Sequence, residues 1–481
     1  MISDWDRREG SPVKVLLLNP PGPFCRAGSR WPHKRAHRRV GIDYHPFPFA
    51  LAYATSRLAA DGHEVKLVDC VATGVTDAEL QALARAFNPD VVFMETSTPS
   101  FHADVGTMRA LGKPCIAGGA HATATPKEHL DAGFAAVIRG EYDQVITEAV
   151  GLAPKPWLAT PDRPQAAYAP LVEDLDAIPY PPWDAMPLEK YNDPVCRGRS
   201  ITVLSSRGCP MRCEFCTLAP YHGQRNYRLR NPRKVCDEID VLIQRYHPDE
   251  IYFDDDSITL NRSHILALCA EIKRRAWRLP FCCMGNAAVD ADILEAMAGA
   301  GCRAFKFGVE SADPEVLRRI PKSLDLDNVL RTARDCRALG IQTHATFLFG
   351  LPGETRKSAL RTIDFALSLR AHTLQFAIVT PYPGTALYER AKQEGWLTKE
   401  TWADFDPAGE AVLSYPNYTA RDIVEMHDLA WRRWQWHMLT RRPATVFHHF
   451  RNAFRREGVG GMFRLGCYAA SRAFAVLRRH G

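Results

Sequence analysis

The chain has 481 residues, which is too long for one ordinary domain, so two or three domains are expected. With 46% hydrophobic and 24% charged residues its composition is globular, and a net charge of +6 does not by itself indicate a nucleic-acid-binding protein. The first ten residues carry five charges and do not have the pattern of a secretory signal. No stretch is apolar for long enough to cross a membrane, so we expect a cytoplasmic protein.

Residues 12–153 alternate strand and helix signals and are expected to form the first domain. Apolar runs such as VKVLLLN are typical of buried parallel strands, and segments with helical spacing of apolar residues separate them. The expected strands lie at residues 13–19, 63–70, 89–97, 114–123 and 135–143. Five such strands predict an α/β domain with a doubly wound parallel sheet, Rossmann-like or flavodoxin-like. No Gly-x-Gly-x-x-Gly follows the first strand, so a dinucleotide is not favoured as its ligand.

Residues 154–198 are rich in proline and are expected to be a linker that lies over both neighbouring domains. Residues 199–400 then repeat a strand–helix pattern six times. The strand candidates are residues 200–206, 250–257, 281–287, 304–311, 342–350 and 374–382. Six such units predict a partial (β/α)6 barrel of the TIM type, with its chemistry at the carboxyl ends of the strands.

Residues 401–481 are expected to be a helical extension. Its last part, residues 429–481, contains eleven arginines, no lysine and one glutamate, together with several aromatic residues. We favour a helical cap whose aromatic side chains pack on the barrel while its arginines face water. The alternative is a set of amphipathic helices that contact an acidic membrane surface.

Three of the fourteen cysteines, Cys209, Cys213 and Cys216, stand within eight residues at the end of the first barrel strand. A structural zinc site usually has four protein ligands, and the only other close pair, Cys282 and Cys283, sits inside an apolar run. Three thiolates leave one metal position open, as a four-iron cluster with a free iron would require. The scattered cysteines are interpreted as buried free thiols in a reducing compartment.

The Cys-x-x-x-Cys-x-x-Cys spacing, with Phe215 before the last cysteine, resembles the signature of the radical S-adenosylmethionine enzymes. The resemblance implies that the three thiolates hold a [4Fe–4S] cluster whose open iron binds S-adenosylmethionine, next to Phe215. YFDDDSITLN, FGVES and FLFGLPGET resemble later cofactor-binding segments of the family. They imply a carboxylate for the methionyl ammonium at Asp255 or a neighbour in 254–256, ribose contacts at Glu310 and Ser311, and adenine near Gly350. For residues 254–256, a solvated loop or a helix N-cap is the alternative.

The first domain resembles the cobalamin-binding domain of the cobalamin-dependent members of that family. KVLLLNPP, PFALAYATSRLAADGHEVKLVD, GGAHATATP and VIRGE carry the resemblance. It implies cobalamin contacts at the carboxyl ends of the strands, where small and polar residues gather. The implied contact residues are Thr96, Ser97, Gly118, Gly119, His121, Arg139, Gly140 and Glu141.

The loop after the first strand departs from the cobalamin pattern. Many cobalamin domains carry Asp-x-His-x-x-Gly, whose histidine binds cobalt, whereas this chain has DYHPFP with Pro48 in place of the glycine. We therefore expect His45 not to ligate cobalt. The same loop holds six lysines or arginines between residues 25 and 39. We favour a solvated basic loop, and a functional one would bind a phosphate or carboxylate of the substrate.

The resemblance implies a C-methyltransferase. S-adenosylmethionine would be cleaved to a 5′-deoxyadenosyl radical, and methylcobalamin would methylate an unactivated carbon, or phosphorus, of a small-molecule or lipid-like substrate. One alternative keeps the architecture but catalyses a non-methylating reaction such as cyclisation, ring contraction or rearrangement. A more remote alternative is a non-catalytic corrinoid and iron–sulfur sensor. We expect a small-molecule substrate, compatible with an amphipathic or anionic compound, and an external electron donor such as flavodoxin or ferredoxin, with no nucleic acid.

Overall fold

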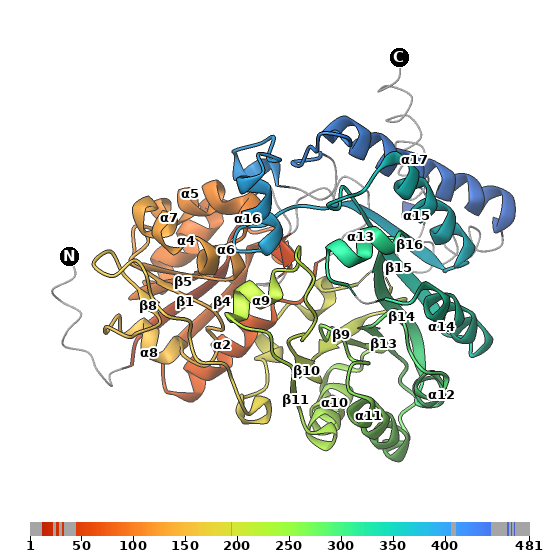
Figure 1. The fold of residues 1–481 in the computed structure, drawn as a ribbon. Helices are drawn as coiled ribbons and strands as arrows, with labels where there is room; N and C mark the ends of the chain where they lie inside the picture. The colour runs from red at the N-terminus through yellow and green to blue at the C-terminus, as the bar shows by residue number, and fades with distance from the viewer. Residues whose placement is uncertain are drawn as a thin grey trace.

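The computed structural model of the chain describes residues 12–22, 26–27, 31–32, 45–193, 195–322, 324–405 and 410–443, and residues 459, 460, 463 and 466. Two six-stranded sheets form the cores of two α/β domains that lie side by side, the first in red to yellow and the second in green to teal (Figure 1). The basic stretch at residues 25–39 lies largely outside the described residues. Among the described helices, none is both long enough and apolar enough to cross a membrane.

The first sheet has the order β4-β1-β5-β6-β7-β8. Its strands are β1 (Lys14–Asn19), β4 (Glu64–Asp69), β5 (Val91–Glu95), β6 (Cys115–Gly118), β7 (Ala136–Ile138) and β8 (Leu158–Ala159). The five expected strands are confirmed and all pair in parallel. The sixth, β8, was not expected: it comes from the proline-rich segment and pairs antiparallel with β7.

Helices cover both faces of this sheet, as the doubly wound prediction requires. They are α2 (Phe49–Ala60), α3 (Cys70–Thr73), α4 (Asp77–Phe87), α5 (Phe101–Leu111), α6 (Ala120–Ala124), α7 (Pro126–Ala132) and α8 (Ile146–Val150). Strand β1 shows why both faces are apolar: Val15 and Leu17 join one buried cluster and Leu16 and Leu18 join another. A strand buried on both faces has no polar alternation, which explains the continuous apolar run in the sequence.

The second sheet has the order β16-β15-β14-β13-β12-β9, and all its strands are parallel. Its strands are β9 (Ser200–Val203), β12 (Glu250–Phe253), β13 (Phe281–Gly285), β14 (Cys302–Glu310), β15 (Gln342–Phe349) and β16 (Thr373–Ile378). Within the described residues β9 and β16 each pair with one neighbour only, so the barrel is open, as predicted. A separate two-stranded antiparallel sheet of β10 (Ser206–Arg207) and β11 (Arg228–Leu229) follows β9, and the chain between its strands contains the three clustered cysteines.

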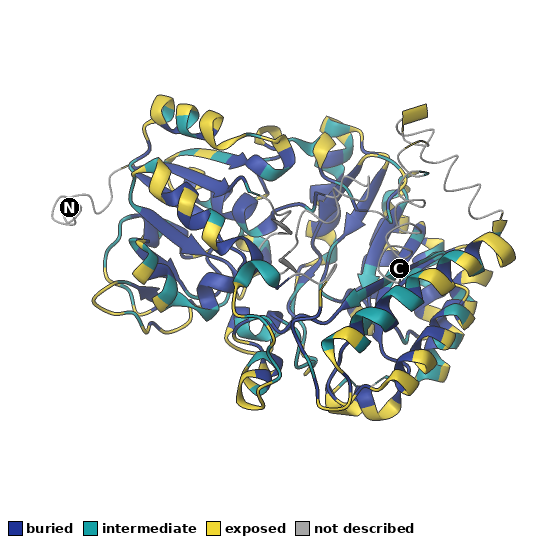
Figure 2. Ribbon diagram, turned by 90° about the horizontal axis from the view of Figure 1, so that it is seen from above, coloured by how far each residue is buried: buried dark blue, intermediate teal, exposed yellow. Residues whose placement is uncertain are grey.

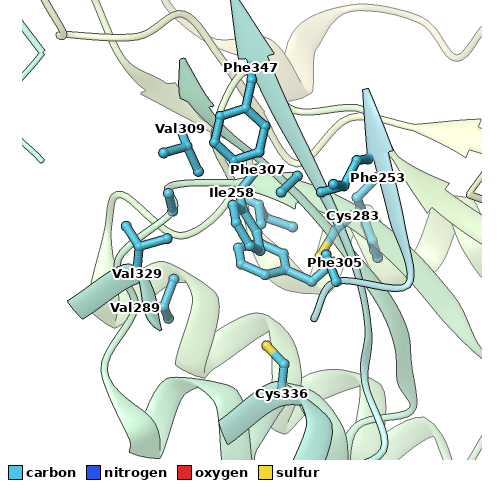
Figure 3. Close-up of a cluster of buried hydrophobic side chains, with 14 of the residues drawn as sticks. Phe253, Ile258, Cys283, Val289, Phe305, Phe307, Val309, Val329, Cys336 and Phe347 are labelled. Atoms are coloured by element: carbon cyan, nitrogen blue, oxygen red, sulfur yellow. The ribbon is translucent and has the colours of Figure 1, made fainter. Parts of the chain in front are cut away.

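Helices pack on the outer face of the barrel sheet. They are α10 (Pro232–Tyr246), α11 (Arg262–Arg275), α12 (Ala291–Gly299), α13 (Pro314–Arg319), α14 (Leu326–Ala338) and α15 (Arg356–Ser368). Figure 3 shows the resulting core, where Phe305 and Phe307 of β14 meet Val329 and Cys336 of α14. The strands of both domains are buried while the helices expose their outer faces (Figure 2).

The prolines of the linker allow it to cross between the domains while its aromatic residues fill the seam. Trp183 and Tyr191 pack against Phe47, with ring centroids 5.2 and 5.1 Å away, and the Tyr191 hydroxyl donates to Oδ2 of Asp69 at 3.0 Å. Phe47 and α2 share one buried cluster with the barrel. The two domains therefore share a hydrophobic core.

The C-terminal part begins with α16 (Ala386–Gln393) and the 3-10 turn η5 (Trp402–Asp404), and it ends in the long helix α17 (Ala420–Arg441). Thr419 and Asp422 form a capping box at the start of α17. Its inner face, with Ile423, Ala430 and Trp434, is buried in the barrel core. One face of α17 thus packs on the barrel, while the assignment of residues 401–481 as a helical cap stays a prediction.

Gly118 at the end of β6 provides a test of how tightly the first domain is packed. An added Cβ atom would lie 2.5 Å from Cζ of Phe93 and 3.0 Å from Cδ1 of Tyr142, and both rings are fully buried. We expect Gly118→Ala to lower the free energy of unfolding by about 1–3 kcal/mol, measured by chemical denaturation. Gly106→Ala in α5, where no atom lies within 4 Å of the added Cβ, is the matched control and should be neutral or slightly stabilising. Equal stability of the two variants would contradict the packing described here.

Candidate active site

The three cysteines lie in the loop that follows β10 at the carboxyl end of the first barrel strand. The loop begins at Gly208, whose φ of +90° and close approach to Asn226 leave no room for a side chain. The N–H of Gly208 donates to Oδ2 of Asp256 at 2.7 Å, and the N–H of Cys216 donates to the carbonyl of Cys213 at 3.2 Å. The three loop cysteines are partly exposed, whereas the other nine described cysteines are buried. The buried cysteines therefore fit the interpretation as core thiols.

The electrostatics of the loop suit a metal cluster. Burial is the largest cause that raises the pKa of Cys213 to about 11 and that of Cys216 to about 12, and negative charge on Cys209 contributes to both shifts. Backbone N–H groups of Met211 and Leu218 hydrogen-bond Cys209 and Cys216 and act in the opposite direction. The three sulfurs interact electrostatically, and N–H donors stabilise thiolate charge. This arrangement fits a [4Fe–4S] cluster held by three cysteines.

Helix α16, which follows the last barrel strand β16, contacts this loop. Arg390 pairs with Glu214, its Nη2 lying 2.8 Å from Oε2, and the N–H of Leu387 donates to the carbonyl of Glu214 at 3.0 Å. Glu214 stands between two cysteine ligands of the motif. The sequence analysis missed this contact, because nothing in the local pattern relates residue 214 to residue 390.

The three consecutive aspartates at the end of β12 have three different environments. Asp255 is fully buried and accepts from the N–H and the hydroxyl of Ser205 at 3.2 and 2.8 Å, and also from the hydroxyl of Ser206. Burial raises the pKa of Asp255 to about 6. Asp254 and Asp256 are partly exposed, and Asp256 interacts electrostatically with Cys209. Asp255 thus holds the segment before the cluster loop, and its contact with the methionyl ammonium stays a prediction.

Glu310 and Ser311 point in different directions. Glu310 adopts a φ of +70° at a shift in the strand register, and its carboxylate accepts from Nζ of Lys322 at 2.8 Å. Its charge raises the pKa of Cys213, whereas Lys322 lowers it, so this ion pair lies near the cysteines. The hydroxyl of Ser311 instead lies 3.3 Å from that of Thr362 in α15. Lys322 was not predicted from the sequence.

Gly350 ends β15 with a φ of +86°. Its N–H donates to Oε2 of Glu354 at 2.5 Å, and its carbonyl accepts from the hydroxyl of Tyr415 at 2.7 Å. Because both polar groups of Gly350 bind protein groups, this turn is rigid. Its neighbourhood to adenine stays a prediction, as does the S-adenosylmethionine contact of Phe215, which is partly buried against the barrel core.

The residues predicted for cobalamin gather at the carboxyl ends of β5, β6 and β7. Gly119 has a φ of +99°, and the hydroxyl of Thr96 lies 2.9 Å from Nε2 of His129. The Ser97 hydroxyl lies 2.7 Å from the Ser100 hydroxyl at a 3-10 turn. Arg139 stacks on the ring of Tyr168 at 4.4 Å, and Gly140, with a φ of +101°, donates its N–H to Thr123. The structure therefore brings these residues to one edge of the sheet, next to Gly118 of β6.

His121 belongs to an aromatic group at the same edge. Its ring is fully buried, Nδ1 lies 3.2 Å from the Thr98 hydroxyl, and no described group hydrogen-bonds Nε2. Burial and neighbouring histidines hold its pKa well below the usual range. Trp402 of η5 packs edge-on against His121 at 5.3 Å and donates to Glu128 at 2.7 Å. The C-terminal part thus reaches the sheet edge predicted to bind cobalamin, a contact that the sequence did not reveal.

Glu141 joins the two domains. Its carboxylate accepts two hydrogen bonds from Arg228, at 2.6 and 2.7 Å, and one from the N–H of Val172 at 3.0 Å. Arg207 lies 3.7 Å from Glu141 and 2.7 Å from Asp143. Although burial alone would raise it, hydrogen bonds from Arg228 and His222 hold the pKa of Glu141 well below the usual range. Arg228 and Val172 thus already engage both oxygens of Glu141. A direct cobalamin contact from Glu141 stays a prediction.

His45 is also described, and it is buried with its carbonyl accepting from the N–H of Asn192 at 3.1 Å. It therefore lies against the linker. The expectation that His45 does not ligate cobalt stays a prediction.

A second group of possible metal ligands lies at the opposite end of the barrel strands. Cys196, Glu250 and Cys282 are buried with their ligand atoms within 4.8 Å of one another. The guanidinium of Arg303 lies 2.6 Å from Oε2 of Glu250 and 2.8 Å from the sulfur of Cys282. Because the Arg303 cation already neutralises this cluster, we interpret Cys196, Glu250 and Cys282 as a structural cluster at the amino ends of the barrel strands rather than as a metal site.

Comparison with known proteins agrees with this arrangement. The radical SAM superfamily model matches residues 203–366, and the B12 binding domain model matches residues 38–150. An uncharacterized methyltransferase of Pyrococcus horikoshii is 30% identical over 437 residues, which cover 86% of this chain and 90% of that protein. Cytidylyl-2-hydroxyethylphosphonate methyltransferase of Streptomyces wedmorensis is 27% identical, covering 88% and 91%. Anaerobic magnesium-protoporphyrin IX monomethyl ester cyclase of Rubrivivax gelatinosus is 26% identical, covering 71% and 66%.

Two solved structures share the fold. One is the radical S-adenosylmethionine methyltransferase TsrM from Kitasatospora setae, solved with cobalamin and a [4Fe–4S] cluster, with a TM-score of 0.63 and 20% identity. The matched residues cover 81% of this chain and 79% of the TsrM chain. The other is the cobalamin-dependent S-adenosylmethionine radical enzyme OxsB, with a TM-score of 0.70, 14% identity and coverage of 96% and 72%.

A cluster loop on a partial barrel, preceded by a B12-binding sheet, defines a class of radical enzymes that use a corrinoid. This chain belongs to the cobalamin-dependent radical S-adenosylmethionine enzymes. Its cofactors are a [4Fe–4S] cluster, S-adenosylmethionine and cobalamin.

The turn at Gly350 generates a pH prediction. Burial raises the pKa of Glu354 to about 8 from an ordinary value of 4.5, so the folded chain keeps a proton that the unfolded chain loses. This contribution to stability is present below about pH 4.5 and is lost as the pH rises through about 8. We expect Glu354→Gln to reduce the pH dependence of the free energy of unfolding by up to about 1.4 kcal/mol per pH unit in this window. The exposed Glu389→Gln is the control, and an unchanged slope in Glu354→Gln would refute the assignment.

The contact at Glu141 generates a second prediction. Glu141→Gln leaves Arg228 buried with an uncompensated charge, and we expect unfolding to become easier by about 3 kcal/mol. Adding Arg228→Gln should restore part of the stability because it removes that charge. Denaturation of the single and double variants measures the coupling, with Glu315→Gln at an exposed ion pair as the control. Strict additivity of the two substitutions would show that the pair does not couple the domains.

Proposed function

We propose that the chain is a methyltransferase that methylates an unactivated carbon, or phosphorus, of a small molecule. When bound, the cofactors supply reductive cleavage of S-adenosylmethionine and a methyl group on cobalt. In this proposal Cys209, Cys213 and Cys216 hold the cluster. Glu310 and Lys322 present a carboxylate and an ammonium to S-adenosylmethionine beside it. The strand ends from Thr96 to Gly140 bind the corrinoid.

The observation that carries the proposal is a group of ion pairs that joins the cluster loop to the strand ends predicted to bind cobalamin. Arg207 stands two residues before Cys209, and it pairs with Asp143 and Glu141, which follow β7. His222, six residues after Cys216, lies 3.3 Å from the same Glu141. Both ends of the cluster loop are thus attached to the edge predicted for cobalamin. Methyl transfer needs such closeness, and the methyltransferase relatives support it.

The inner face of the barrel sheet supports a substrate with polar groups. On β14 and β15 the outward side chains Phe305, Phe307 and Phe347 are fully buried, while the inward Lys306 and His344 are partly exposed. Nζ of Lys306 lies 3.2 Å from Oδ2 of Asp193. Burial first, and then Lys306, lower the pKa of His344 to about 4, so its imidazole is neutral at ordinary pH.

This inner face offers hydrogen-bond donors to the polar part of an amphipathic or anionic substrate. In this proposal an external donor such as flavodoxin or ferredoxin reduces the cluster. The enzyme works in the cytoplasm, with its C-terminal helices against a membrane surface and without nucleic acid.

The product pattern tests the activity. After anaerobic reconstitution with iron, sulfide and hydroxocobalamin, reductant and S-adenosylmethionine are added and both adenosyl products are quantified by chromatography. We expect 5′-deoxyadenosine and S-adenosylhomocysteine together, because methyl transfer consumes one further S-adenosylmethionine. Cys213→Ala should abolish 5′-deoxyadenosine, whereas Cys236→Ala in α10, outside the loop, should retain it. Omission of cobalamin should abolish S-adenosylhomocysteine.

The competing function is a non-methylating radical reaction on the same architecture, which the cyclase relative favours. Formation of 5′-deoxyadenosine alone, with cobalamin bound, would replace the methyltransferase proposal with this one. Formation of neither product would favour a corrinoid sensor.

A further inference from the structure

The end of α17 carries an unusual apolar surface. Among the described residues, the four most exposed large hydrophobic side chains are Trp436, Leu439, Val459 and Phe463, each at least 62% exposed. The next side chains in this ranking reach only 38%. Trp436 and Leu439 lie in the last two turns of α17, and Val459 and Phe463 follow later in the chain.

Trp436 and Leu439 share one face of the helix. They are three residues apart, and Arg432 lies one turn before Trp436 on the same side. The opposite face, with Trp434 and Met438, is buried against the barrel. The helix is thus apolar on two sides, and barrel packing accounts for only one of them.

Four arginines, Arg432, Arg433, Arg441 and Arg442, lie on or just after the described end of α17. In the sequence, residues 429–481 contain eleven arginines against a single glutamate. Within the described residues, no carboxylate forms an ion pair with Arg432, Arg441 or Arg442, whereas Arg433 pairs with Asp364. The guanidinium of Arg442 donates instead to the carbonyls of Arg370 and Ala371.

The basic groups near the end of α17 also act on one another electrostatically. After burial, the charges of Arg337 and Arg370 are the largest causes that lower the pKa of Arg442. The charges of Arg442 and Arg441 likewise lower the pKa of His437, whose burial also contributes. Cations that raise one another's energy are stabilised when an anionic surface approaches.

We propose that the end of α17 docks on an anionic phospholipid surface, with Trp436 and Leu439 inserted between headgroups and Arg432, Arg441 and Arg442 bound to their phosphates. Tryptophan suits this position because its ring is apolar and its N–H remains in the wet interfacial layer. Arginine binds phosphate through paired N–H donors. A helix that lies on the membrane in this way shows an apolar stripe flanked by cations. This inference rests on the membrane contact of the proposed function and specifies its site and lipid class, and it does not depend on the reaction that the enzyme catalyses.

Vesicle sedimentation of the full chain tests the proposal. The probes are vesicles of phosphatidylcholine alone and of phosphatidylcholine with phosphatidylglycerol, at low and high salt. We expect binding to the anionic vesicles only, with release at high salt because the attraction is electrostatic. Trp436→Ser with Leu439→Ser should weaken binding about tenfold or more, and Arg432→Gln or Arg441→Gln about fivefold each.

Two matched variants guard against general effects. Leu360→Ser replaces an exposed leucine of α15, and Arg421→Gln replaces an exposed, ion-paired arginine at the start of α17. Both should bind like the parent chain. Because all the substituted side chains are exposed, thermal unfolding should confirm that each variant is folded.

Three outcomes would overturn the proposal. Equal binding to neutral vesicles would remove the role of the arginines, and unchanged binding of the Trp436/Leu439 variant would place the contact elsewhere. A dimer in sedimentation velocity that the same variant dissociates, without vesicle binding, would identify a second copy of the chain as the partner.

Discussion

The architecture depends on one buried contact, the pairing of Glu141 with Arg228 and Arg207. Isolated charges are costly to bury, and this carboxylate is held by two hydrogen bonds from a single guanidinium, the geometry in which such pairs are strongest. The two partners come from different domains: Glu141 follows strand β7 of the first sheet, and Arg228 lies in β11, which pairs with β10 just before the cluster loop. A pair of this kind also resists small displacements, because any shift leaves charge uncompensated in a low-dielectric site. The ion pair therefore fixes the distance between the cluster loop and the strand ends predicted to bind cobalamin more closely than apolar packing alone could.

The cluster loop shows the same logic at shorter range. Its entry is held by Asp255 and Asp256, through Ser205 and the N–H of Gly208, and its centre by Arg390 through Glu214. A loop of eight residues has little hydrophobic material of its own, so neighbouring strand ends supply its order. The acidic run DDD thus divides its work: one carboxylate is buried under the loop, one binds the loop backbone, and one faces the inner side of the barrel. Three identical side chains acquire different properties from position alone.

The parts that could be predicted from sequence are those with a local signature. Buried parallel strands are continuous apolar runs, so the five parallel strands of the first sheet and the six of the barrel sheet were found. The three cysteines were found because soft ligands at fixed spacing are rare. Glu214–Arg390, Lys322 and Trp402 were missed, since each acts through a residue far away in the chain and none has a distinctive neighbourhood. Strand β8 was missed because two residues in a proline-rich segment carry no periodicity.

Helix α17 connects features that the sequence keeps apart. Its first turn packs on the turn predicted for adenine, where a Cβ atom at Gly350 would lie 3.1 Å from Ile423. Arg356, just after that turn, pairs with Asp422 and Glu425 at 2.6 and 2.8 Å. From there, 22 residues at 1.5 Å each carry the helix about 33 Å to its basic, apolar end. Between its two ends Ala430, Trp434 and Met438 pack in the barrel core. Because the helix is continuous and packed along its length, the position of its exposed end is fixed relative to the turn at Gly350.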